Sequence, residues 1–325
     1  MKTIHWGIMS TGNIANEFLE GLADLPATKV TAVGSRSLDK ANAFADKHAI
    51  PNRYGSYEAL VQDPDVNVIY IGTPHPFHEE NSLLCLNGGK AALCEKPFAL
   101  NLEQAQTVVK IACEKKLFMM EAVWTVFLPH IVKLREIIET GAIGEVRMLQ
   151  ADFGFRIDFD PGSRLFDPSL GGGSLLDVGL YPLILAQMLF GPATQIKSFA
   201  QLGQTGVDEE ASLLLRYANG QTASLISATR LQTPNEAFIM GTEGRIHIPH
   251  EWWRPNDLIL YKNGQRETVS VDCPLPGHNY EALEVNKCLR ADKTESDTMP
   301  LDATLSLMQT LDEIRSQWGL RYPGE

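Results

Sequence analysis

An acid and a lysine stand side by side at Glu95 and Lys96, directly before Pro97. The apolar run at residues 90–94 has the length of a buried strand, and a proline cannot continue a central strand. We therefore expect both side chains at the carboxyl end of a strand, where open α/β sheets bind their ligands. An ammonium group there could stabilise negative charge that develops on a substrate oxygen.

A second acid lies four residues before a phenol, at Asp177 and Tyr181. If the chain is helical from Ser174, the two side chains share one face of the helix, and Pro182 bends that helix. An acid and a phenol are costly to bury without partners. A satisfied hydrogen bond in the core is the alternative to a catalytic pair, and the two residues alone favour it.

A turn after the first apolar run resembles a phosphate-binding loop. The dinucleotide fingerprint G-x-G-x-x-G/A fits Ser10-x-Gly12-x-x-Ala15 only if serine replaces the first glycine. Gly12 would let the backbone approach a pyrophosphate, and a helix amino terminus would face its charge. An ordinary strand–turn–helix is the alternative. The candidate cofactor-binding residues of this turn are Ser10, Thr11, Gly12, Asn13 and Ile14.

The end of the second expected strand bears on which nicotinamide cofactor would bind. A site that prefers NAD places an acid there, which accepts hydrogen bonds from the ribose hydroxyls. This sequence has Ser35 and Arg36 instead, with no acid before Asp39. Because a guanidinium binds phosphate in a bidentate fork, the pair favours the 2′-phosphate of NADP, with NAD possible. A solvated arginine that opens a helix is the alternative.

A loop with two prolines and two histidines, residues 73–78, follows the strand expected at residues 66–72. His75 and His78 have no Cys, Asp or Glu nearby to complete a ligand set, so we expect no metal site. The loop should lie beside a bound cofactor, which makes Thr73, Pro74 and His75 candidate contacts. His78 is expected to cap or pack the next helix.

These residues need elements that position them, and the first 122 residues alternate strands with helices, which is typical of a parallel sheet. The strands are expected at residues 4–9, 29–34, 66–72, 90–94 and 117–121. The helices are expected at residues 14–25, 38–48, 57–61, before Gly88-Gly89 and after Asn101. Residues 1–122 are thus expected to be a doubly wound nucleotide-binding domain.

Residues 123–325 follow a different pattern. Hairpin signals at Asn219-Gly220, residues 242–244 and Asn263-Gly264 predict an open, mostly antiparallel sheet. Helices are expected at residues 128–140, 174–190, 280–290 and 302–318, and a strand at 145–155. The fold class is therefore α/β followed by an α+β domain for the substrate and for dimerisation.

Composition limits the partners. The chain has 325 residues, 44% of them hydrophobic and 21% charged, and a net charge of −12, which disfavours nucleic acid. Five cysteines form no C-x-x-C pair, which fits a reducing, cytoplasmic compartment. Neither a signal segment nor a run of transmembrane length is expected, because Asp177 and Pro182 interrupt the longest apolar stretch.

Taken together, these motifs resemble the glucose–fructose oxidoreductase/inositol dehydrogenase family, and within it the dimeric trans-dihydrodiol dehydrogenase group. The resemblance extends over essentially the whole chain. It rests on residues 10–15, Ser35-Arg36, Glu95-Lys96-Pro97 and the run Gly171–Pro182, together with His75-Pro76, residues 118–124 and residues 205–208. Ser10, where relatives carry Gly, is the departure from the family pattern.

The resemblance implies roles for individual residues. Lys96 would hold the reacting oxygen, Tyr181 would donate or accept the proton, and Asp177 would orient the substrate or the base. Glu95, Lys96 and Pro97 would contact the cofactor, and Arg164 would approach the cofactor or the mouth of the substrate site. The residues that resemble the group's aromatic wall for the substrate are Trp124, Phe153 and Trp252 or Trp253.

We therefore expect an NADP(H)-dependent dehydrogenase or reductase that acts on a small cyclic molecule, either an aldose such as D-xylose or a trans-dihydrodiol. A non-catalytic NADP-bound regulator and a structural subunit are the rivals, and Lys96 with Tyr181 disfavours the first. Apolar residues such as Leu213, Leu215, Leu225 and Ile226 occur at both odd and even positions of the expected sheet. We therefore also expect that one sheet face is buried in a homodimer or a higher homo-oligomer.

Overall fold

The computed structural model describes residues 1–325, which form two compact units. Unit 1 comprises Met1–Trp124 and Leu275–Leu305, and unit 2 comprises Thr125–Pro274 and Ser306–Glu325. The first boundary lies two residues from the predicted one. The chain-order division into residues 1–122 and 123–325 differs from this result, because a late segment of the chain packs with the first unit.

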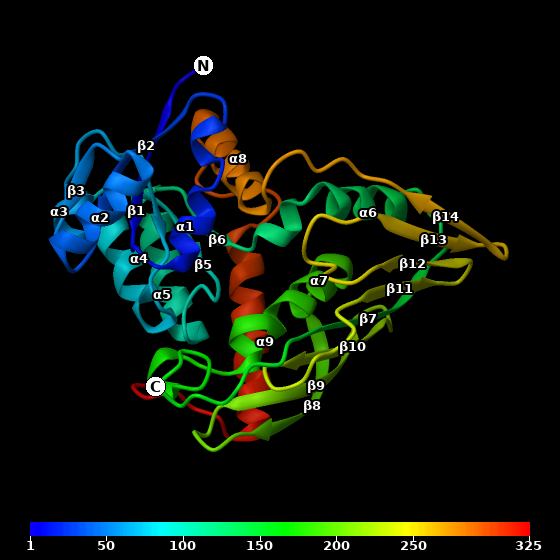
Figure 1. Cartoon of the computed structure of the whole chain (residues 1–325). Helices are drawn as coiled ribbons and strands as arrows, with labels where there is room; N and C mark the ends of the chain where they lie inside the picture. The colour runs from blue at the N-terminus through cyan, green and yellow to red at the C-terminus, as the bar shows by residue number, and fades with distance from the viewer. The chain divides into compact units, whose positions relative to one another are not determined.

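Unit 1 contains a six-stranded parallel sheet in the order β3-β2-β1-β4-β5-β6 (Figure 1). Its strands are β1 Ile4–Met9, β2 Thr28–Gly34, β3 Asn52–Tyr54, β4 Val68–Ile71, β5 Ala91–Glu95 and β6 Met119–Ala122. Every residue of β4, β5 and β6 is buried, as expected where helices cover both faces of a parallel sheet. The predicted doubly wound sheet is confirmed.

The helices of unit 1 begin largely where the sequence predicts. They are α1 Asn13–Leu19, α2 Leu38–His48, α3 Tyr57–Val61, α4 His78–Asn87, α5 Leu102–Lys115 and α8 Gly277–Arg290. The Asn101 side chain accepts a hydrogen bond from the Gln104 N–H, and Gln104 accepts one from the Leu100 N–H. The expected helix at residues 14–25 was wrong in length, because Gly21 adopts φ +73° and ends the regular helix early.

Helix α8 packs with unit 1 because polar groups at the amino ends of β1 and β2 need partners. Asn286 accepts a hydrogen bond from the indole N–H of Trp6 at 3.1 Å and donates one to Thr28 at 2.9 Å. The Arg290 guanidinium donates to the carbonyl oxygens of Pro26 and Ala27, both at 2.9 Å. Hydrogen bonds between distant parts of the chain thus decide the unit to which α8 belongs.

Unit 2 contains an eight-stranded sheet in the order β14-β13-β12-β11-β7-β10-β9-β8. Its strands are β7 Val146–Gly154, β8 Ala193–Leu202, β9 Asp208–Tyr217, β10 Thr222–Ala228, β11 Ala237–Gly241, β12 Gly244–Ile248, β13 Leu258–Lys262 and β14 Gln265–Val269. Only β7 and β10 pair in parallel, so the predicted mostly antiparallel sheet is confirmed. Asn263 and Gly264 both have positive φ in the β13–β14 hairpin, as a two-residue turn requires.

Three helices belong wholly or mainly to unit 2: α6 Pro129–Glu139, α7 Leu180–Phe190 and α9 Leu301–Trp318. The Gln317 amide of α9 donates to the carbonyl oxygen of Ile196 in β8 and accepts from Ser198, which fixes this helix to the edge of the sheet.

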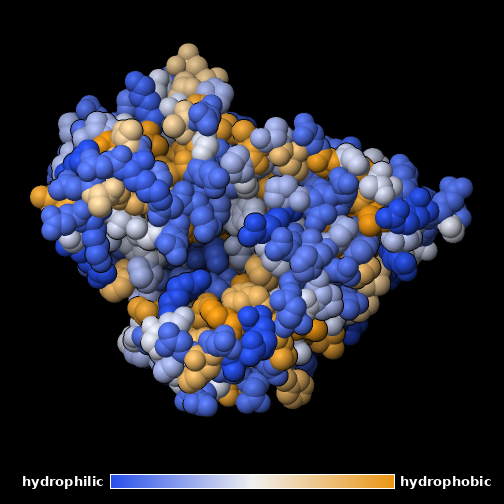
Figure 2. Space-filling model, viewed as in Figure 1, coloured by the Kyte–Doolittle hydropathy of each residue, from blue (hydrophilic) through white to orange (hydrophobic).

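The longest apolar stretch corrects one prediction. Pro168–Phe190 is long and apolar enough to cross a membrane by length and composition, although the sequence predicted no such run. Asp177 and Pro182 do not lower the hydropathy or the length of this stretch below what a membrane-spanning helix needs. In the structure 78% of its most apolar window is buried inside the protein. The face of the molecule in Figure 2 is mostly hydrophilic, with hydrophobic residues in small separate groups.

Candidate active site

In unit 1, the turn between β1 and α1 has the geometry of a phosphate-binding loop. Ser10 has φ +136°, a conformation that glycine adopts freely and other residues rarely do. Serine therefore stands where the fingerprint has glycine and keeps a glycine-like backbone. Its hydroxyl accepts a hydrogen bond from the Gly12 N–H at 3.1 Å. A Cβ at Gly12 would meet only that hydroxyl, so the turn leaves open space where a pyrophosphate could approach.

The loops after β2 and β4 come together at the carboxyl edge of the same sheet. The Arg36 guanidinium lies 5.5 Å from the centre of the Phe77 ring. Ser35 is buried, and its hydroxyl accepts a hydrogen bond from the Ser37 N–H. A serine hydroxyl and a guanidinium at this edge are groups that could hold a ribose phosphate.

The loop after β4 is held by His78. This side chain is fully buried, and its two ring nitrogens lie 2.7 Å from the Thr73 carbonyl oxygen and 2.6 Å from that of Pro97. The Thr73 hydroxyl accepts a hydrogen bond from Asn81 at 2.9 Å. His78 therefore connects the Thr73-Pro74-His75 loop to the loop that carries Lys96, and it packs α4 as predicted.

Glu95 and Lys96 end β5 as the sequence predicts, with Glu95 the last residue of the strand. Glu95 accepts a hydrogen bond from the Tyr70 hydroxyl at 2.6 Å and another from the Lys96 N–H at 3.2 Å. Burial, together with the Glu95 charge, raises the pKa of Tyr70 well above its usual value, so its hydroxyl remains a donor. The strand end is therefore fixed by a neighbouring strand.

Glu121 supports the same loop from β6. It is fully buried and accepts hydrogen bonds from the Phe98 N–H at 2.9 Å and from Thr304 at 3.0 Å. Burial raises its pKa to about 7. Glu121 was not among the predicted site residues, and the available signal was an acid inside an otherwise apolar strand.

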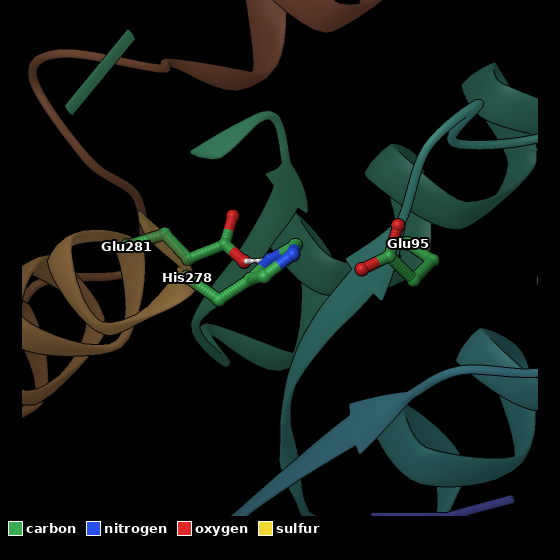
Figure 3. A group of neighbouring side chains, drawn as sticks. All are labelled: Glu95, His278 and Glu281. Atoms are coloured by element: carbon green, nitrogen blue, oxygen red, sulfur yellow. Dashed lines mark hydrogen bonds and ion pairs between the residues drawn. The ribbon is translucent and has the colours of Figure 1, made fainter. Parts of the chain in front are cut away.

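Two more titratable side chains, His278 and Glu281, converge beside Glu95, and the sequence analysis identified neither. Figure 3 shows His278 of α8 between Glu281 and Glu95, with ligand-type atoms of the three within 4.8 Å of one another. Carboxylate and imidazole groups also bind divalent metals. Here, protein hydrogen bonds already engage both Glu95 oxygens and the Nδ1 atom of His278, so the group is satisfied mainly within the protein.

In unit 2, the second predicted pair lies on an irregular helix. Leu175–Gly179 is a π-helical turn, and α7 continues from Leu180, so the predicted helix exists but begins with a wider turn. Asp177 and Tyr181 are both buried. The Arg164 guanidinium donates a hydrogen bond to Asp177 at 2.8 Å. Arg164, predicted as a cofactor contact, is thus an ion-pair partner of the acid.

The π-helical turn is anchored by Asp208 at the start of β9. One carboxylate oxygen accepts hydrogen bonds from the Leu175 N–H at 2.7 Å and the Ser174 hydroxyl at 2.8 Å. A Cβ at Gly173 would lie 2.2 Å from the other oxygen, and Gly173 has φ +117°, so only glycine fits. Burial raises the pKa of Asp208 to about 6. This residue lies in the 205–208 motif, for which the sequence suggested no role.

The aromatic residues of unit 2 form one cluster around Tyr181. Phe153 lies 5.3 Å from Tyr181 and stacks on Trp253, with ring centroids 3.4 Å apart. Trp252 is fully buried behind Trp253, and its N–H donates to the Asp152 carbonyl oxygen at 2.8 Å. The prediction named Trp252 or Trp253 for the substrate wall, and of the two it is Trp253 that stacks on Phe153. Trp124, the fourth predicted member of the wall, belongs to unit 1.

The structure therefore gathers the predicted residues into two groups. Unit 1 brings together the turn at 10–14, Ser35-Arg36, the loop at 73–75 and Glu95-Lys96-Pro97 along one sheet edge. Unit 2 brings together Asp177, Tyr181, Arg164, Phe153 and Trp253. The first group has the strand order and the open glycine turn that a dinucleotide requires.

Family models match both parts of the chain. Residues 4–122 match the oxidoreductase family with an NAD-binding Rossmann fold, and residues 131–247 match the GFO/IDH/MocA C-terminal domain. The protein is therefore an oxidoreductase with a nicotinamide-binding Rossmann domain. It belongs to the GFO/IDH/MocA family, as the sequence motifs indicated.

Curated relatives match over nearly the full length. The chain is 39% identical to trans-1,2-dihydrobenzene-1,2-diol dehydrogenase of Xenopus tropicalis, with 98% of this chain and 99% of the relative covered. It is 37% identical to the human protein of the same name, with 98% of each chain covered. The chain is thus similar to dehydrogenases over both units.

Solved structures share the fold at lower identity. Aldose-aldose oxidoreductase from Caulobacter crescentus has a TM-score of 0.90 at 20% identity, with 98% of this chain and 99% of that chain covered. The 3-ketoreductase KijD10 from Actinomadura kijaniata, in complex with NADP and TDP-benzene, has a TM-score of 0.88 at 24% identity, with 97% and 98% covered.

Proposed function

We propose that the protein is an NADP(H)-dependent oxidoreductase that transfers a hydride between the nicotinamide and a C–OH or C=O group of a small cyclic substrate. The leading substrates are an aldose such as D-xylose and a trans-dihydrodiol. The full-length similarity to dihydrodiol dehydrogenases supports the second. One observation carries the proposal: the buried Tyr181 phenol lies one turn after Asp177, within an aromatic cluster. A binding module has no use for Tyr181 together with Lys96.

The residues of the chain would supply the proton and the charge. When bound, the cofactor accepts or delivers the hydride, and the protein orients it. During oxidation, Tyr181 would take the hydroxyl proton of the substrate, and the Lys96 ammonium would stabilise the developing alkoxide. Asp177, held by Arg164, would orient the substrate or the phenol. In the reverse direction Tyr181 returns the proton.

The preference for NADP rests on Ser35 and Arg36. No carboxylate follows β2 before Asp39, and the Arg36 guanidinium lies over the Phe77 ring, near the edge where a ribose would bind. A guanidinium attracts a 2′-phosphate and gives no advantage to a 2′-hydroxyl.

We further propose a homodimer formed through the open face of the sheet in unit 2. At least one residue on each of β8, β9 and β10 presents a large apolar side chain to solvent: Phe199 is 82% exposed, Leu214 54% and Ile226 39%. Pairing this face would remove them from water. Light scattering at micromolar concentration should give twice the 35.9 kDa chain mass, and a mass of one chain would contradict the proposal.

A cytoplasmic location is proposed on the cysteines. All five are free thiols, and Cys85, Cys94 and Cys288 are buried. Free, buried thiols are typical of proteins kept in a reducing compartment.

A substrate screen tests the central proposal. Pentoses, hexoses, inositols and trans-dihydrodiols are incubated with NADP, and NADPH formation is followed by absorbance. At least one class should react, and Tyr181→Phe should abolish most of that rate. If cofactor binds but no class reacts in either direction, a non-catalytic NADP-bound regulator becomes the better account.

A further inference from the structure

The first turn of α8 and the Trp124 indole fit closely within unit 1. The ring centroids of Trp124 and His278 are 4.9 Å apart, and the ring planes are inclined by 35°. A Cβ at Gly277 would lie 2.2 Å from an indole carbon of Trp124. The position of this indole therefore depends on Gly277 and His278, neither of which the sequence identified.

His278 is surrounded by acids. Its Nδ1 atom lies 3.1 Å from Glu281, and Figure 3 shows the ring between Glu281 and Glu95. Glu281 is fully buried, and its second oxygen has no hydrogen-bond partner. Glu17 of α1 adds a further negative charge that acts on His278. An isolated carboxylate is costly to bury. A positive charge on the His278 imidazole therefore offsets part of the cost of burying Glu281.

The pKa shifts of the two residues agree with this geometry. Burial lowers the pKa of His278, but the hydrogen bond and charge of Glu281, with Glu95 and Glu17, outweigh it, so this pKa lies above its ordinary value. Burial raises the pKa of Glu281 to about 7, partly offset by His278. The Tyr70 hydroxyl, which faces Glu95 from β4, stays protonated. The pair therefore changes its charge near neutral pH.

We propose that His278 is a positioning residue for the substrate: fixed by Glu281, its protonated ring holds the Trp124 indole in place, and loss of the proton weakens substrate binding. A cation beside an indole attracts the ring electrons, and a neutral imidazole does so far less. The inference rests on the proposed function only where it assigns Trp124 to the substrate wall.

Tryptophan emission tests the coupling without any substrate. The emission of Trp124, taken as wild type minus Trp124→Phe, is titrated between about pH 5.5 and about pH 9, the range in which histidines change charge. We expect a step above the ordinary histidine pKa that His278→Gln abolishes. Glu281→Gln should move the step to lower pH, because the nearest negative charge is gone. His5→Gln, a histidine of β1 that contacts Thr31, should leave it unchanged.

Kinetics then test the effect on the substrate. As His278 loses its proton, KM should rise by about threefold to tenfold with kcat constant, as expected for the loss of one cation–ring contact. In His278→Gln, KM should be high and independent of pH.

If Trp124 shows no step, or a step that survives His278→Gln, the proposal is overturned. If the emission step is present but KM does not change with pH, the proposed role of His278 in substrate binding is overturned. If His278→Gln fails to fold, Glu281→Gln tests the proposal instead, because its emission step should move to lower pH. With no substrate known, the emission titration still tests the coupling apart from the proposed function.

Discussion

The two units hold their chemical groups by different means. In unit 1, Glu95 and Lys96 stand at the end of a regular strand, and the loops beside them follow other strands of the same sheet. In unit 2, Asp177 lies on an irregular π-helical turn that precedes the regular helix α7. A sheet edge positions residues through the hydrogen bonds of the backbone ladder, whereas an irregular helix needs side chains from other elements to hold it.

Burial has a different consequence in each unit. In unit 1, Glu95 is satisfied by Tyr70 from the neighbouring strand and by its own loop. In unit 2, Asp208 has one oxygen engaged by Leu175 and Ser174 and the other buried without a partner. The second arrangement is the less stable one, because an unsatisfied buried oxygen keeps its desolvation cost.

The largest expected effect separates the proposed proton donor from the cofactor site. Tyr181→Phe keeps the ring in its aromatic cluster and removes the hydroxyl, so kcat should fall by roughly 10²–10⁴ with NADP affinity little changed. Lys96→Met should abolish turnover as well, because the oxyanion loses its cation. Steady-state rates and a cofactor titration measure the two effects. Near-normal turnover of Tyr181→Phe at neutral pH would contradict this assignment and would indicate that another group, such as His75, transfers the proton.

The next effect belongs to unit 1 alone. Arg36→Asp should weaken NADP binding by about 1.5–3 kcal/mol through the loss of a charge-assisted contact, and should weaken NAD binding much less. Fluorescence titrations with both coenzymes measure the difference. Arg53→Asp is a control on the same unit, since the Arg53 guanidinium is already paired with Asp46. An equal loss for both coenzymes would contradict the 2′-phosphate assignment.

A third change tests whether the π-helical turn depends on its anchor. Asp208→Ala leaves the Leu175 N–H and the Ser174 hydroxyl with fewer partners, at a cost of about 1–3 kcal/mol in the free energy of unfolding. Turnover should fall with stability, because Asp177 and Tyr181 follow this turn. Denaturant unfolding and kcat are measured together, with Asp167→Ala as control on an exposed cap. An unchanged free energy of unfolding would show that the π-helical turn is stable without the Asp208 carboxylate.

The smallest effect is one of pH. The pKa of Asp208 is raised by burial from 3.8 to about 6, so the folded state binds its proton more tightly than the unfolded chain does. That contribution to stability is complete below about pH 4 and is lost as the pH rises through about 6. Asp208→Asn, which carries no titrating proton, should flatten the dependence of unfolding free energy in this range. A curve parallel to that of the wild type would place the titrating group elsewhere.

The sequence by itself determined the elements and the sheet edge of unit 1. Apolar runs bounded by glycine and proline, and caps such as Asn101, act over a few residues, so they can be read locally. The same local logic placed Ser10, Arg36 and Lys96 at strand ends. It also placed Asp177 and Tyr181 one helical turn apart, although the turn proved to be a π-helical one.

Only the tertiary structure decided which distant groups meet. Asn286 joins Trp6 across most of the chain, Asp208 anchors Ser174, and His278 contacts Trp124. The two buried tryptophans, Trp252 and Trp253, are neighbours in sequence, yet only the second stacks on Phe153. Such contacts arise because buried polar groups and rings must find partners wherever the chain brings them, and no local spacing records that choice.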